Sequence, residues 1–168
     1  MDGIMPGLEA APNIHPMFVH FPVALWPAAA VFMAIAYLRE SEDMFRFATY
    51  LLYAGVVTGV IAATSGWFAA DSMGHDQPGH HLVHDHRNFM LAALVVSALA
   101  AGAAYWCKTT ERKRKRWLPA GLLLVACLLA TLGADRGGLL VYGHGIGVRK
   151  QAPDAAESAQ HDHSGHSH

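Results

Sequence analysis

Four long stretches of the chain contain no Asp, Glu, Lys or Arg, at residues 17–38, 47–70, 89–107 and 117–134. A helix that crosses the hydrocarbon core of a bilayer needs about 20 mainly apolar residues, within a range of roughly 17–25. A soluble bundle would place polar residues on its outer faces with a period of about 3.6 residues, and none of the stretches has such a face. The pattern therefore predicts four transmembrane helices, the last extending to about residue 140.

The predicted fold is all-α, an integral membrane four-helix bundle with up-down topology, formed by residues 1–148. Residues 149–168 contain a histidine-rich tail that cannot build a core, so we expect it to be disordered. Composition supports a membrane chain, because 53% of residues are hydrophobic and 15% are charged, against roughly 25% charged residues in soluble domains. The formal net charge of −1 gives no reason to expect a nucleic-acid partner. The expected surroundings are a lipid bilayer.

The basic residues indicate how the bundle is oriented. The link at residues 108–116 reads KTTERKRKR, and the link at residues 39–46 adds two arginines, so these links hold eight of the twelve Lys and Arg residues. The positive-inside rule places such links in the cytoplasm. An even number of spans then leaves both termini outside. The first fourteen residues lack the basic region of a signal peptide, so we expect a multi-pass protein of the bacterial inner membrane with periplasmic termini.

Several residues inside the stretches bear on how the helices pack. Gly55 and Gly59 form a GxxxG motif, which favours close helix packing without identifying the partner. Pro22 and Pro27 should kink the first helix, which neighbouring helices can tolerate. Most aromatic residues lie near the ends of the stretches, as interfacial belts require. Trp26 is the exception, because it lies in the middle of its stretch.

All histidines of the chain fall on the outer side of this topology. Imidazole is the commonest metal ligand in proteins and titrates near neutral pH, so a one-sided distribution suggests a site. The twelve residues are His15, His20, His75, His80, His81, His84, His86, His144, His161, His163, His166 and His168.

The first two histidines lie at the start of the first span, in NIHPMFVHFPVAL. Their separation of five residues turns a helix by about 140°, so His15 and His20 point in different directions and cannot both hold one small ion without distortion. His20 lies within the apolar stretch, where an ionisable side chain is rare and by default suggests a function. The alternative is a neutral, hydrogen-bonded histidine packed at the helix end.

The remaining histidines lie in the second outer link, at the end of the last span and in the tail. Gly74, Pro78 and Gly79 indicate a loop, so we expect only His84 and His86 of this link to reach the membrane surface, while His75, His80 and His81 are solvated. His144 lies among glycines, which favour a helix end. Short histidine-rich tracts can bind metal ions, so the candidate metal ligands are His84, His161, His163, His166 and His168.

Four motifs together resemble a known family. The segments HPMFVHFPVAL, GWFAAD, HRNFM and GGLLVYGHGIGV, spread over residues 13–148, closely resemble the bacterial membrane family called domain of unknown function 2231. The resemblance implies four spans. Some members are fused to Rieske or cytochrome c-like domains, which implies a link to electron transfer. By resemblance, the family's histidines correspond to His15, His20, His86 and His144.

These four histidines should lie at one depth, on three helices that meet at the outer face. Helix bundles build cofactor sites from side chains on facing helices, and two neutral imidazoles can ligate haem iron without covalent attachment. No CxxCH occurs, which excludes a c-type haem. We therefore expect His15, His20, His86 and His144 to bind haem b in an electron-transfer protein with a periplasmic or membrane redox partner.

The sequence leaves two alternatives open. In one, the same histidines hold Zn or Cu and the loop and tail supply the ions. In the other, the chain is a non-catalytic accessory subunit whose histidines form hydrogen bonds at the interface. No span carries an Asp or Glu at mid-membrane to move an ion, and no HExxH or nucleophile beside a base is present. We expect no catalytic residue, and a homo-oligomer remains an open alternative.

Overall fold

The computed structural model describes residue 4 and residues 13–71, 79–110 and 115–146. In this part the chain forms four helices and no strand. They are α2 (His15–Leu38), α3 (Glu42–Asp71), α4 (His80–Thr109) and α5 (Trp117–His144). All four are long and apolar enough to cross a membrane, which confirms the predicted all-α membrane bundle. The histidine-rich tail lies outside the described residues.

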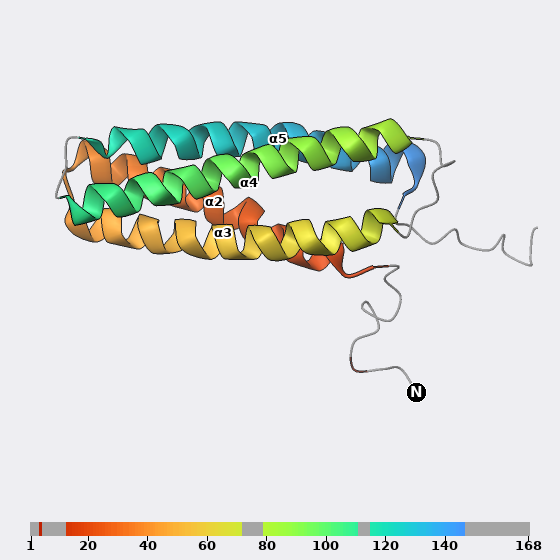
Figure 1. Ribbon diagram of the computed structural model, residues 1–168, viewed down its shortest axis with the longest axis horizontal. Helices are drawn as coiled ribbons and strands as arrows, with labels where there is room; N and C mark the ends of the chain where they lie inside the picture. The colour runs from red at the N-terminus through yellow and green to blue at the C-terminus, as the bar shows by residue number, and fades with distance from the viewer. Residues whose placement is uncertain (1–3, 5–12, 72–78, 111–114, 147–168) are drawn as a thin grey trace, which may run out of the picture.

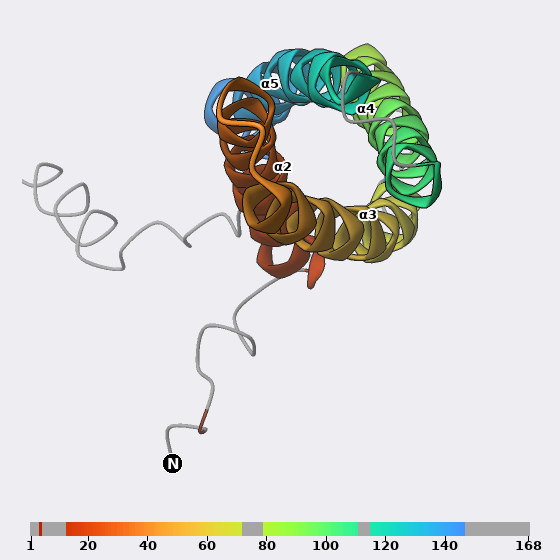
Figure 2. The same ribbon diagram turned by 90° about the vertical axis from the view of Figure 1, so that its left-hand side faces the viewer.

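The helices run alternately up and down and form two hairpins. Figure 1 shows the four helices side by side, and Figure 2 shows them around a common axis in the order α2, α3, α4, α5. α2 packs mainly on α3 and α4 mainly on α5, with fewer contacts between the two hairpins. We call the end where α2 and α4 begin and α3 and α5 end the histidine end; it lies on the right in Figure 1.

Helix boundaries at the histidine end follow from local chemistry. Proline suits the first turn of a helix, and Pro16 follows His15 at the start of α2. α5 is capped by Gly145, whose left-handed φ of 65° lets the N–H of the next residue, Ile146, bond back to the carbonyl of Leu140 at 3.0 Å. α4 begins directly after Gly79, at His80. The expectation that His80 and His81 lie in a solvated loop was therefore wrong, because the helix extends well beyond the uncharged stretch.

The second hairpin (α4 and α5) repeats the buried positions of the first (α2 and α3) at a constant distance along the sequence. Every buried residue of α4 lies 71 positions after a buried residue of α2. The pairs are Pro22 and Ala93, Trp26 and Ser97, Ala29 and Ala100, Met33 and Ala104, and Ala36 and Cys107. In α3 and α5 the same offset relates Ala48 to Pro119, Leu52 to Leu123, Gly55 to Ala126, Gly59 to Ala130, and Ala62 to Gly133. The hairpins are thus related by an approximate twofold axis that runs along the bundle, as in parallel repeats of other membrane proteins.

The GxxxG motif of α3 accommodates an indole ring. A Cβ atom on Gly55 would lie 2.6 Å from Cδ1 of Trp26, and one on Gly59 would lie 3.1 Å from its Cζ2. Trp26 is only 1% exposed, so its position in the middle of the span reflects burial in the core. The motif therefore serves packing between α2 and α3 of one hairpin.

We expect Gly55→Ala to destabilise the bundle by about 1–3 kcal/mol, because the new methyl group overlaps a side chain that has no room to move. This loss outweighs the gain in helix propensity of about 1 kcal/mol that Gly→Ala brings. Unfolding in detergent, followed by circular dichroism, measures the difference. Gly102→Ala and Gly121→Ala are matched controls, because a Cβ atom at either position meets nothing within 4 Å. Equal stability of Gly55→Ala and these controls would contradict the packing described.

At the other end of the bundle, a buried arginine lies on the twofold axis. Arg116 is 4% exposed, and its guanidinium carbon lies 4.2 Å from the ring centroid of Phe45. Its Nη2 donates a hydrogen bond to Oε1 of Glu42 at 2.5 Å. Phe45 and Arg116 are separated by the same 71 positions as the core pairs. The basic link of the sequence thus also contributes one residue to the interior.

Candidate functional site

His15 is the first residue of α2 and its ring is held by α3. Nδ1 lies 3.0 Å from the carbonyl oxygen of Ala62 and 3.1 Å from Oγ of Ser65. A carbonyl only accepts, so Nδ1 carries a proton and donates it. Gly66 makes room for the ring, because a Cβ atom there would lie 2.8 Å from Cε1 of His15.

His86 on α4 has an equivalent carbonyl partner and an equivalent glycine in the second hairpin, although among the described residues it has no counterpart of the Ser65 contact. Its Nδ1 donates to the carbonyl oxygen of Gly133 on α5 at 2.8 Å. A Cβ atom on Gly137 would lie 3.1 Å from Cε1 of His86. Each histidine is separated from its carbonyl partner by 47 residues. The twofold axis therefore relates the histidines, their carbonyl partners and the two glycines.

The two imidazoles meet across the bundle. Their ring centroids are 6.5 Å apart, with an angle of 83° between the planes. They come from α2 and α4, which lie diagonally opposite each other in Figure 2. The histidine end thus presents two imidazoles oriented by backbone carbonyls, and the Nε2 of each has no hydrogen-bond partner among the described residues.

The other predicted site residues lie elsewhere. His20 is exposed on the outer surface of α2, and His144 is exposed at the end of α5. The ring of His144 lies against Gly79, where a Cβ atom would be 3.2 Å from its Cδ2. His84 faces a separate pocket, and the four histidines of the tail fall outside the described residues. Among the described residues, no group of three or more His, Cys, Asp or Glu side chains is arranged to hold a metal ion.

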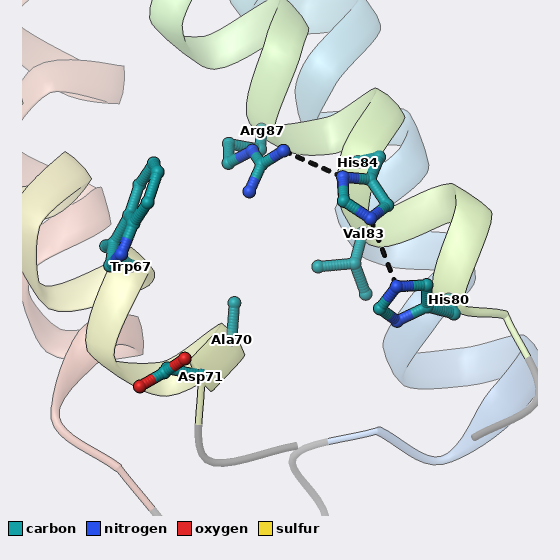
Figure 3. Close-up of a pocket in the computed structure, with 7 residues that line it drawn as sticks. All are labelled: Trp67, Ala70, Asp71, His80, Val83, His84 and Arg87. Carbon is teal, nitrogen blue, oxygen red and sulfur yellow. Dashed lines mark hydrogen bonds between the residues drawn. The ribbon is translucent and has the colours of Figure 1, made fainter. Parts of the chain in front are cut away.

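The separate pocket, about 200 Å³ in volume, lies between the end of α3 and the start of α4 (Figure 3). Nη2 of Arg87 donates to Nδ1 of His84 at 2.7 Å, and the guanidinium lies 5.2 Å from the ring centroid of Trp67. Nε2 of His84 lies 3.1 Å from Nε2 of His80. The residues that line the pocket are Trp67, Ala70, Asp71, His80, Val83, His84 and Arg87.

Sequence reasoning missed the glycines and carbonyls that orient the two imidazoles, and it missed Trp67 and Arg87 as pocket residues. One signal was available. His15 is followed by Phe18 as His86 is followed by Phe89, and Gly66 and Gly137 share the same offset. This spacing would have identified the repeat and paired the two histidines.

Comparisons with known proteins agree with the architecture. No curated protein and no solved structure matches the chain. The family model described as a predicted membrane protein, DUF2231, matches residues 11–150. The match covers all four helices, His15 and His86, and the residues that line the pocket. It confirms the resemblance seen in the sequence motifs. The chain therefore belongs to the DUF2231 family of membrane proteins.

Proposed function

We propose that this membrane protein binds haem b between His15 and His86 and takes part in electron transfer. The observation that carries the proposal is the imidazole pair on the twofold axis, in which each Nδ1 donates to a backbone carbonyl and each Nε2 has no hydrogen-bond partner among the described residues. A metal-binding histidine characteristically donates the N–H of its other ring nitrogen to a carbonyl or carboxylate, which fixes the tautomer and the orientation of the ring.

The number of ligands favours haem over a bare metal ion. Zinc takes three or four protein ligands, and no group of three candidate ligands occurs among the described residues. Haem supplies four nitrogens of its own and needs only axial ligands from the protein. A metal lies about 2.0–2.1 Å from an imidazole nitrogen, so two rings that share one metal have centroids roughly 6 Å apart. The observed separation of 6.5 Å is close to that value.

Small residues surround the pair. Apart from Ser65, the positions of α3 and α5 that contact the two imidazoles are Ala62, Gly66, Gly133 and Gly137, none of which has a side chain larger than a methyl group. Bulky side chains at these positions would exclude a flat macrocycle. Bound there, haem would supply one-electron redox chemistry, and the protein would supply axial ligation and low polarity.

The distribution of basic residues bears on which side of the membrane the imidazole pair faces. The basic links oppose the histidine end, which by the positive-inside rule supports a site at the outer face of the bacterial cytoplasmic membrane. An electron-transfer partner would then approach from the periplasm or laterally within the membrane. The exposed His20 on α2 is available to a second chain.

The test is a visible spectrum. The full-length protein is expressed with ample haem, purified in mild detergent and examined oxidised and after reduction by dithionite. We expect a Soret band and the sharp reduced bands of a six-coordinate haem, with one haem per chain. A preparation without a Soret band would overturn the proposal. Elemental analysis for Zn and Cu, repeated on a chain that ends at residue 153, would then test the metal-handling alternative without the tail.

A further inference from the structure

The pocket between the end of α3 and the start of α4 brings charged, imidazole and aromatic side chains together. Figure 3 shows Arg87 and Asp71 on opposite sides of the open space, with the indole of Trp67 forming a wall. Arg87 contacts Trp67 and His84 but forms no salt bridge with a described carboxylate. Ala70 and Val83 add apolar surface. The pocket thus combines an aromatic wall with donors at one side and a carboxylate at the other.

Comparison of the two hairpins shows that the fold does not require the charged and imidazole groups of this pocket. The equivalent seam lies between the end of α5 and the start of α2. Five lining positions have described counterparts at the 71-residue offset, and none of the charged or imidazole groups is retained. Trp67 corresponds to Gly138, Ala70 to Val141, Asp71 to Tyr142, His84 to Asn13, and Arg87 to Pro16. The polar groups are therefore specific to one of two structurally equivalent seams.

Hydrogen bonds indicate which ring nitrogen donates and which accepts in the two imidazoles of the pocket, His84 and His80. Nδ1 of His84 accepts from Arg87, so its proton lies on Nε2, and Nε2 donates to Nε2 of His80. His80 then carries its own proton on Nδ1. The chain of donors leads from the pocket to the first residue of α4.

We propose that this pocket binds the headgroup of a membrane quinone, in its quinone and quinol forms. A flat ring with two opposite oxygens would stack against Trp67 and accept a hydrogen bond from Arg87 at one oxygen, and in the quinol form its other hydroxyl would donate to Asp71. Binding of the headgroup does not rest on the haem of the proposed function.

The test measures binding of ubiquinone-1 and of menadione, as representative benzoquinone and naphthoquinone probes. Isothermal titration calorimetry of the full-length protein in detergent, with protein-free micelles as the blank, gives the Kd. The double variant His15→Ala, His86→Ala is measured in parallel and should bind equally well, because the pocket does not include those residues. This arm separates failure of the quinone proposal from failure of the haem proposal.

Variants locate the site. We expect Arg87→Gln to weaken binding about tenfold or more, since a charged hydrogen bond to the headgroup is lost. Ala70→Phe should fill the pocket and abolish binding, while Val141→Phe, the matched change at the equivalent seam, should leave the Kd unchanged. Circular dichroism checks that each variant is folded. The proposal is overturned if neither probe binds, if Arg87→Gln and Ala70→Phe bind like Val141→Phe, or if millimolar inorganic phosphate displaces the quinone, which would indicate an anion site.

Discussion

Replacing His15 or His86 by alanine is expected to abolish the Soret band of the purified protein or to convert the haem to a five-coordinate form. In the proposed site each imidazole would supply one of two axial ligands, and within the described residues no other His, Cys, Asp or Glu lies in a group with the pair to replace it. Haem b has no covalent attachment, so loss of a ligand weakens its retention as well as its coordination. Oxidised and reduced spectra, with haem quantified per chain, measure the effect.

His20→Ala and His144→Ala are the matched controls for these variants. Both histidines are exposed and lie apart from the pair, so both variants should keep the spectrum of the parent protein. The reverse result, with loss of the band in His20→Ala and retention in His15→Ala, would contradict a site inside one chain. Haem would then have to bind on the outer surface of α2, against another chain.

Gly66→Ala is expected to weaken haem binding about tenfold or more without unfolding the protein. The added methyl group would lie 2.8 Å from Cε1 of His15, so the ring must rotate away and its hydrogen bond to Ala62 must lengthen. Changes to the groups that orient a metal-binding histidine typically reduce affinity by about 10–100-fold. Titration of the haem-free protein with hemin, followed at the Soret band, gives the affinity.

The two hairpins provide graded controls for this prediction. Gly137→Ala would place its methyl group 3.1 Å from His86, a milder overlap, whereas Gly138→Ala meets nothing within 4 Å. We therefore expect the largest loss of affinity at position 66, a smaller one at 137 and none at 138. Equal affinities in all three variants would show that these glycines do not set the positions of the imidazoles.

Much of the fold could be predicted from the sequence, because a bilayer imposes a simple requirement on composition. Uncharged stretches long enough to span the membrane identified all four helices. They did not identify the start of α4, where His80, Asp85 and Arg87 lie on helical turns beyond the uncharged stretch. A helix can continue past the apolar layer once its polar side chains reach the interface, so hydropathy marks the apolar layer better than the helix ends.

The site was only partly predictable. The rotation between His15 and His20 showed that they point apart, but which of them faces inward depends on packing against α3. The repeat was hidden because its equivalent core positions hold residues as different as Trp26 and Ser97, or Met33 and Ala104. The 71-residue offset becomes visible only when burial is known, because equivalent residues of the two hairpins share their position in the bundle but seldom their residue type.

The pairing of Arg116 with Phe45 has a consequence for how such a bundle can diversify. Both residues occupy the same position in their respective hairpins. In a symmetric dimer of identical hairpins, the residue on the axis would meet its own copy, so that position would hold two phenylalanines or two mutually repelling arginines. Covalent fusion removes this restriction. One chain can place a cation against an aromatic ring on its symmetry axis, and can give one seam charged and imidazole groups that the described part of the other seam lacks.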